Sequence, residues 1–215
     1  LKFNLSSSLL SNFNLGYLKG IIRPTYKGRR NNYKNVKYEG FSLSFNRDLL
    51  NNRFLPTEGY LISLDTDLGL NNDFIYIDGK ISFNNYFRVK NRFYSTYKWI
   101  GEGIKIFNSK VPKSRYKYFG GVSSLRGYNN NQFKSTQYSI SSFEFGYVFN
   151  SNLHGIFFSD IGSKKLKIIR NDNISYGIGL KKINENIILN IEYAFSRDIV
   201  LLSKGKLHIQ IISRF

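Results

Sequence analysis

The sequence predicts an all-β fold, an antiparallel transmembrane β-barrel, and three observations support this prediction. Apolar and polar residues alternate with a period of two along almost the whole chain, which is typical of strands with two different faces. Most alternating runs exceed the roughly 5–6 residues of soluble strands and reach the roughly 9–11 residues of a tilted transmembrane strand. The polar positions carry Gly, Ser, Asn, Asp, Glu and Lys, as a wet lumen would, and aromatic residues such as Trp99 recur near the ends of runs.

The alternation is clearest in residues 173–183. Ile174, Tyr176 and Ile178 share one face of this run, and Ser175 lies on the other. Short polar turns separate many such runs, and no composition break indicates a second domain. We therefore expect about eleven strands, at residues 1–8, 12–22, 38–48, 58–70, 73–88, 92–107, 137–150, 154–162, 173–183, 186–196 and 205–215.

The composition excludes several classes of protein. The 215 residues include no Cys, which excludes a disulfide scaffold and thiolate metal sites. No run approaches the roughly 18 apolar residues of a transmembrane helix. There are 32 Lys and Arg against 14 Asp and Glu, for a net charge of +18. The charges are spread along a chain that is rich in Asn, Ile and Lys. A general bias of composition therefore explains the net charge better than a functional basic surface does. A soluble basic β-protein that binds nucleic acid or another polyanion is the alternative from a different class.

The most specific motif lies in the longest predicted connection, residues 108–136. It reads Tyr-Phe-Gly-Gly-Val-Ser-Ser-Leu-Arg-Gly-Tyr at residues 118–128. Gly120 and Gly121 allow a tight turn with positive φ. Arg126 stands between an apolar residue and a Gly-Tyr pair, where a guanidinium can insert into a cavity and pair with a buried carboxylate.

The motif and several others in the same order resemble the BamA and two-partner-secretion transporter superfamily. The matching segments are Phe119-Gly120-Gly121 with Ser124-Leu125-Arg126-Gly127-Tyr128, Leu55-Pro56-Thr57-Glu58-Gly59-Tyr60, Val111-Pro112, Phe143-Glu144-Phe145, Phe158-Ser159-Asp160-Ile161-Gly162, Ser175-Tyr176-Gly177-Ile178-Gly179 and Gly205-Lys206-Leu207-His208. The resemblance covers roughly residues 55–215. It implies a sixteen-stranded barrel with five strands after the signature loop, and five predicted strands follow residue 136. Residues 1–215 are then expected to be the C-terminal barrel region, without the N-terminal strands and the periplasmic POTRA domains.

The resemblance also implies roles for individual residues. Arg126, with Gly127 and Tyr128, is expected to fold back into the lumen and contact Asp160 and Glu144. Alternation places Glu144 on the polar face, whereas Asp160 shares a face with Ile156 and Phe158, so its direction is less clear. The expected role is a conformational lock of the loop rather than catalysis. The terminal Phe215 resembles the sorting signal of bacterial barrels.

The function implied by the resemblance is assembly of other proteins. We expect a bacterial outer-membrane factor that inserts β-barrel proteins through a lateral gate, with the lipid bilayer, unfolded barrel polypeptides and accessory lipoproteins as partners. A polypeptide secretion pore of the same superfamily is the alternative, since the signature loop does not separate the two. We expect no enzymatic activity, cofactor, metal or nucleic acid. His154 and His208 are the only histidines, and His208 is expected to be an ordinary lumen residue.

Overall fold

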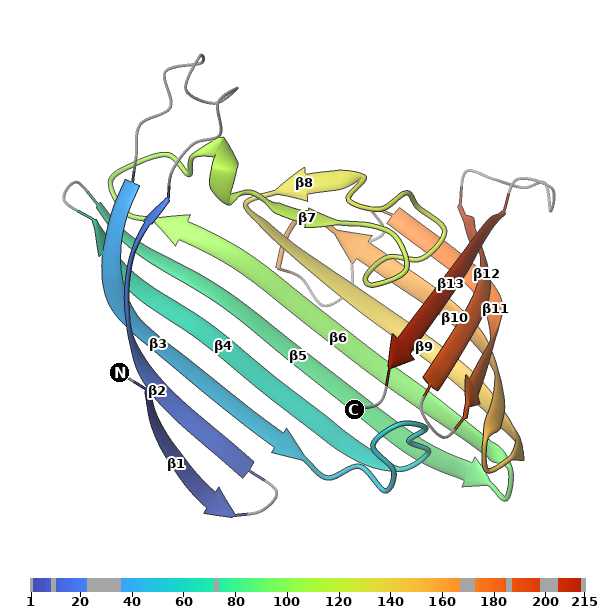
Figure 1. Ribbon diagram of the computed structural model, residues 1–215. Coiled ribbons are helices and arrows are strands. Elements are labelled where there is room, and N and C mark those ends of the chain that lie inside the picture. Colours follow the sequence, from blue (N-terminus) through green and yellow to red (C-terminus); the bar gives the residue numbers. More distant parts are fainter. Residues whose placement is uncertain are drawn as a thin grey trace.

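Eleven antiparallel strands form one continuous sheet in the computed structural model of the chain (Figure 1). The structure describes residues 2–8, 11–22, 36–71, 74–166, 173–184, 187–197 and 205–213. The strands of the large sheet are β1 (Lys2–Ser8), β2 (Ser11–Ile22), β3 (Val36–Asp48), β4 (Gly59–Asn71), β5 (Phe74–Lys90), β6 (Phe93–Ile106), β9 (Gln137–Asn150), β10 (Leu153–Ser163), β11 (Asn173–Ile183), β12 (Ile187–Ser196) and β13 (Lys206–Ser213). The eleven predicted strands are thus confirmed, with bounds that differ by a few residues.

Within the described residues, each strand of this sheet pairs with the next strand in the chain, except that β6 pairs with β9 across the separate β7–β8 hairpin. The sheet curves like the wall of a barrel, and β1 and β13 form its two edges (Figure 1). Among the described residues these two edge strands do not pair with each other. The predicted fold class, an antiparallel transmembrane barrel, agrees with this architecture.

The apolar face of the sheet is its outer face. Phe143, Phe145 and Phe157 are 43%, 48% and 56% exposed, although aromatic side chains of this size are normally buried in soluble proteins. The polar side chains that alternate with them point to the concave side, where Glu144 is only 4% exposed. An apolar exterior around a polar interior suits lipid, and it contradicts the soluble alternative, because a soluble β-protein would bury its aromatic face.

Two inward tyrosines lie over glycines of the neighbouring strand. Tyr76 pairs in register with Gly69, and Tyr94 pairs with Gly146. A Cβ atom on either glycine would overlap the tyrosine ring. The two rings are only 2% exposed as a result, so these glycines are required by packing rather than by backbone conformation.

The connection between β6 and β9 contains structure that the sequence did not predict. A short 3-10 helix, η1 (Lys113–Arg115), precedes a hairpin of β7 (Lys117–Phe119) and β8 (Phe133–Ser135). Strands of three residues are too short to show an alternation, so the whole connection was predicted to be irregular. The rings of Phe119 and Phe133 lie 5.1 Å apart in this hairpin. In the described part of the chain, no helix has the length and apolarity to span a bilayer.

Candidate functional site

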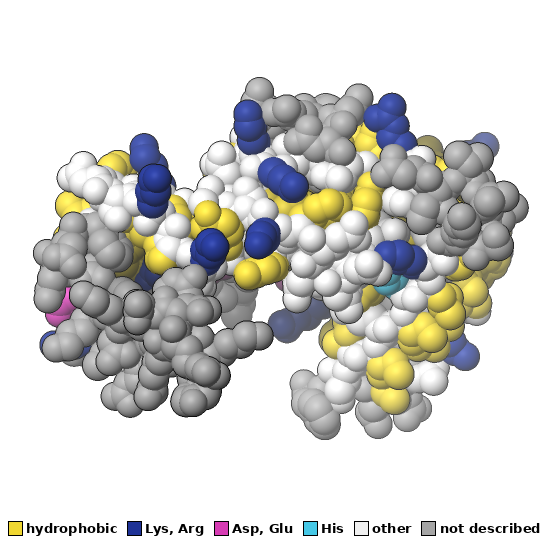
Figure 2. Space-filling view, turned by 90° about the horizontal axis from the view of Figure 1, so that it is seen from above, with side chains coloured by type: hydrophobic (Ala, Val, Ile, Leu, Met, Phe, Trp, Pro, Cys, Tyr) yellow, Lys and Arg dark blue, Asp and Glu magenta, His cyan; other side chains and the backbone are white. Residues whose placement is uncertain are grey.

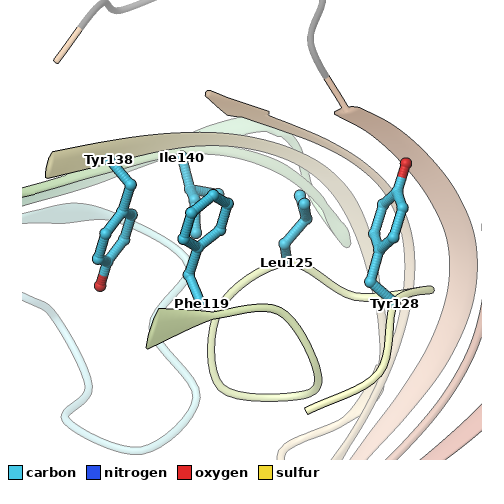
Figure 3. Close-up of a cluster of buried hydrophobic side chains, with 5 residues drawn as sticks. All are labelled: Phe119, Leu125, Tyr128, Tyr138 and Ile140. Carbon is cyan, nitrogen blue, oxygen red and sulfur yellow. The ribbon is translucent and has the colours of Figure 1, made fainter. Parts of the chain in front are cut away.

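The loop between β6 and β9, residues 107–136, packs its apolar side chains against the inner wall of the barrel. Phe119 and Leu125 from the loop are 1% and 0% exposed, and they cluster with Tyr138 and Ile140 of β9 (Figure 3). The rings of Phe119 and Tyr138 stack with centroids 4.7 Å apart. This contact fixes the loop inside the barrel rather than above it.

A tight turn directs the loop toward the wall. Gly120 and Gly121 have φ angles of 114° and 93°, a region that side chains with a Cβ rarely adopt. The Gly120 N–H donates to Ser124 Oγ at 2.8 Å, and the Gly121 N–H donates to the Leu125 carbonyl at 2.9 Å. The turn thereby delivers Arg126 to the inner face of the sheet.

Arg126 forms a bidentate ion pair with Asp160 of β10. Its Nε donates to Asp160 Oδ2 at 2.8 Å and its Nη2 donates to Oδ1 at 2.6 Å. The Arg126 backbone N–H also donates to Oδ2, at 3.3 Å. The two side chains are 7% and 0% exposed. Two parallel charged hydrogen bonds in a buried site hold both the position and the orientation of the guanidinium.

The other hydrogen bonds of the guanidinium involve two strands of the wall. Nη1 donates to Glu144 at 2.9 Å and to Glu192 of β12 at 3.1 Å, and Nη2 donates to Ser142 Oγ at 2.8 Å. The ring of Phe158 lies beneath the guanidinium, with its centroid 3.5 Å from Cζ, a favourable cation–π geometry. Arg126 thus contacts three strands of the wall.

The charges of this site are balanced. Lys98 of β6 and Lys181 of β11 bind Glu144 Oε2 at 2.9 and 3.1 Å. With Arg126 they form three cations, which face the three carboxylates of Glu144, Asp160 and Glu192. Burial opposes the charge of Arg126, but the nearby carboxylates outweigh it, so the pKa of its guanidinium is raised above the ordinary value. A neutral cluster with its hydrogen bonds made is the arrangement in which buried charges are tolerated. We call these six side chains the arginine cluster.

The tip of the loop contacts the last strand, β13. The Gly127 N–H donates to His208 Nε2 of β13 at 3.1 Å, and Lys206 Nζ donates to Asn129 Oδ1 at 2.6 Å. Tyr128 donates from its hydroxyl to the Ile174 carbonyl at 3.1 Å. The tip of the loop is therefore attached to the strand at the edge of the sheet.

A second ion-pair site anchors the entry to the loop. Lys117 of β7 lies 2.6 Å from Asp78 of β5 and 3.0 Å from Glu102 of β6. The other oxygen of Glu102 accepts a hydrogen bond from the Tyr138 hydroxyl at 2.7 Å. The loop is therefore held at two points, by Lys117 in its first half and by Arg126 near its middle.

The structure brings together the residues that the sequence singled out, and it adds others. Asp160 points inward with Ile156 and Phe158, which resolves the direction that alternation left open. Sequence reasoning did not single out Glu192, and it gave no role to the Phe158 ring. His208 was expected to be an ordinary lumen residue, but it accepts a hydrogen bond from the loop. The further residues that sequence reasoning missed are Ser142, Lys98 and Lys181. Phe215 lies outside the described residues.

Comparison with protein families identifies the fold family. The model of the Omp85 superfamily domain matches residues 4–197. The chain belongs to the Omp85 superfamily. This agrees with the resemblance seen in the sequence and places this Omp85 protein in the bacterial outer membrane. No curated protein matches the chain.

Solved structures show the same fold. BamA from Haemophilus ducreyi lacking POTRA domains 1–3 superimposes with a TM-score of 0.76 at 15% identity, over 98% of this chain and 52% of that one. CdiB from Acinetobacter baumannii has a TM-score of 0.56 at 14% identity, over 98% of this chain and 39% of that one. The Omp85 chain thus spans about half or less of the chains it matches.

Proposed function

We propose that this Omp85 chain inserts β-barrel proteins into the outer membrane by offering the free edge of β13 to a substrate strand. The observation that carries the proposal is the attachment of the loop tip to this edge strand, through Gly127 and His208. A loop held by the arginine cluster and bonded to the edge strand can couple its own position to that of the edge.

The edge of β13 is suited to accept a strand. Leu207, Ile209 and Ile211 alternate along it and are 61%, 57% and 67% exposed on the lipid side. Among the described residues, β13 pairs on one side only, with β12. Unpaired backbone groups in lipid cost several kcal/mol each, so this edge must be covered by another strand. Strand addition would supply those hydrogen bonds to an incoming polypeptide.

In this mechanism the loop is a conformational lock. Arg126 holds the loop to Glu144 and Asp160, while Gly127 and Tyr128 bond to His208 and to the Ile174 carbonyl, and no catalytic step takes part. We further propose that residues 1–215 are the C-terminal part of a larger barrel, with lipid, unfolded barrel polypeptides and accessory lipoproteins as partners. Phe215 would serve as the sorting signal during the protein's own assembly.

A secretion pore of the same superfamily is the second candidate, and a polar cavity favours it. This cavity, of about 410 Å³, lies between the loop and the inner wall, where β4, β5, β6, β9, β11, β12 and β13 all contribute to its lining. Ser63, Ser82 and Asn84 from the wall and Ser123 from the loop line it. Because its lining is polar, the cavity can hold water beside the loop, as a path for an unfolded polypeptide requires.

Site-specific photocrosslinking in cells distinguishes the two candidates. A photoreactive amino acid placed at Ile209, on β13 of the full-length protein, should capture newly made outer-membrane barrel proteins. The same group at Ile178, on the interior strand β11 and equally exposed at 57%, is the matched control and should capture none. Both positions face lipid, so a difference between them reports the edge.

Crosslinking from a position in the lumen tests the secretion pore. A secreted polypeptide captured from Asn84, with no barrel protein captured from Ile209, would replace assembly by secretion. Equal capture of barrel proteins from Ile209 and Ile178 would show that the lipid-facing surface binds them nonspecifically, and it would remove the support for an edge mechanism.

A further inference from the structure

An unneutralised positive surface lies at the end of the barrel that carries the loop. It consists of exposed lysines from β6, the loop and the segment after β10, and we call it the basic rim: Lys105, Lys110, Lys113, Lys134, Lys164 and Lys165. Seen from this end, the molecule shows Lys and Arg side chains across its surface and almost no Asp or Glu (Figure 2). Among the described residues, none of the six lysines has a carboxylate partner.

The sequence explains why the rim is unneutralised. No Asp or Glu occurs between Gly103 and Phe143. The flanking carboxylates, Glu102 and Glu144, both face inward and are already engaged by cations of the lumen. Four lysines of the rim, Lys105, Lys110, Lys113 and Lys134, therefore have no carboxylate in their own stretch of chain to pair with.

The opposite end of the barrel also carries exposed cations. There, acidic residues accompany the basic ones, and Arg88 lies 3.6 Å from Glu58. Asp48 adds a further carboxylate at this end, beside Arg47. Arg53, Lys90 and Arg92 are also exposed there. The loop end is therefore distinguished by its six clustered lysines and by the stretch of residues 104–142 without Asp or Glu, a charge pattern that suits an external anion.

The rim also reaches onto the outer, lipid-facing wall. Ser139 and Ser141 alternate with inward residues of β9 and so face outward, yet they are only 2% and 1% exposed. Residues 164–166, the segment after β10, lie over this face, because Ser139 Oγ donates to the Lys165 carbonyl at 2.8 Å. Leu166 continues across to β6, with Cδ2 only 3.2 Å from the place of a Cβ on Gly101.

This placement sets the lysines at the membrane boundary. Leu166 is 50% exposed and covers Gly101 and Gly103 of β6, and it lies three residues beyond Ser163, where β10 ends. Lys164 and Lys165 precede Leu166 directly. Their stems can follow the apolar wall while their ammonium groups reach the polar headgroups.

We propose that the basic rim binds the phosphate groups of anionic lipids in the outer leaflet beside the barrel. Longer loops of bacterial barrels face outward, so the loop end lies at the outer leaflet. Cations beside a membrane are attracted to anionic headgroups within about a Debye length. The lipid contact would hold the segment after β10 against the wall, next to the loop and its arginine cluster.

The test uses fluorescent lipid A, a glycolipid with two phosphates, titrated into the detergent-solubilised full-length protein. The variant combines Lys134→Gln, Lys164→Gln and Lys165→Gln. We expect its affinity to fall at least tenfold, since each cation near a lipid headgroup contributes roughly fivefold. Dephosphorylated lipid A should bind the wild type as weakly as the phosphorylated form binds the variant.

A matched variant removes three exposed cations from the opposite end, by Arg53→Gln, Lys90→Gln and Arg92→Gln. We expect its lipid A affinity to stay within twofold of the wild type. Both variants replace exposed residues only, and the heat-shifted mobility of the folded barrel on a gel verifies that each one folds.

Three results overturn the proposal. Equal weakening in the two variants would reduce the effect to net charge, and equal binding of dephosphorylated lipid A would remove the phosphate from the interaction. Competition by millimolar inorganic phosphate or by single-stranded DNA as strong as that by unlabelled lipid A would assign the rim to a soluble anion.

Discussion

Arg126→Ala tests the arginine cluster directly. In the wild type, Arg126 makes six hydrogen bonds to its neighbours, five of them from the side chain. Its removal leaves Asp160, at 0% exposure, with the Ser142 hydroxyl as its remaining side-chain donor among the described residues. Glu144 keeps both of its lysines. The expected damage therefore centres on the Asp160 carboxylate.

The exposures of the ion pair set the size of the effect. Breaking a buried ion pair costs about 3–5 kcal/mol, because one charge is left uncompensated, whereas an exposed pair is worth about 0–1 kcal/mol. The side chains of Arg126 and Asp160 are 7% and 0% exposed, so the buried value applies. We expect Arg126→Ala to lower the free energy of unfolding by about 3–5 kcal/mol.

The measurement is urea unfolding of the full-length protein in detergent, followed by the heat-shifted band on a gel. Arg88→Ala is the control, since the Arg88–Glu58 pair is more than half exposed on both sides and should lose at most about 1 kcal/mol. Arg126→Lys keeps the charge without the bidentate fork and should lose about 1.5–3 kcal/mol.

Removal of both partners gives the decisive comparison. The double variant Arg126→Ala, Asp160→Ala has no unpaired carboxylate at position 160, so its loss should be smaller than the sum of the two single losses. Additive losses, or an Arg126→Ala variant that unfolds like Arg88→Ala, would refute the view that this is a desolvated ion pair.

Three further changes test other parts of the site. Gly127→Ala should cost about 1–3 kcal/mol, because φ at this position is 80° and the new Cβ would lie 2.9 Å from the carbonyl carbon of Phe195; faster proteolysis within the loop measures it. Gly146→Val should cost at least about 1–3 kcal/mol, since the side chain would overlap the ring of Tyr94; the urea midpoint measures it. Lys117→Gln removes the cation between two carboxylates of β5 and β6, and hydrogen exchange should rise in β7 while the β9–β10 pairing stays protected.

Each of these changes has an outcome that contradicts its reasoning. A loop equally resistant to protease in the Gly127 variant would mean that the backbone can relax without strain. An unchanged midpoint for the Gly146 variant would mean that the tyrosine ring moves freely. Exchange that rises throughout the barrel in the Lys117 variant would show a general loss of stability rather than a local anchor.

The strands of this Omp85 chain could be predicted because alternation is a local property. Each run carries its own period of two, and a long connection before residue 137 interrupts the series. The hairpin of β7 and β8 could not be predicted in this way, because strands of three residues are too short to show a period. Likewise, the segment after β10 has no periodic signal that shows it lying on the outer wall.

The site was predictable only where a motif carried it. Arg126, Glu144 and Asp160 stand in stretches that resemble the superfamily. Glu192 reaches the same guanidinium from 66 residues away, and its place depends on the register of β12 against its neighbours. Phe158 was seen as one more apolar residue, because a sequence does not show that a charged group will lie on its ring.

The attachment of one loop to late strands has a consequence for the order of folding. Arg126 can bond to Glu192 only after β12 has paired. Gly127 can bond only after β13 has paired, since His208 follows it by 81 residues. A shift of β12 by one residue would turn the Glu192 side chain to the lipid, because successive side chains of a strand face opposite sides. The loop can therefore close completely only on strands that have found their correct alignment. Complete closure of the loop thus depends on the correct register of β12 and β13.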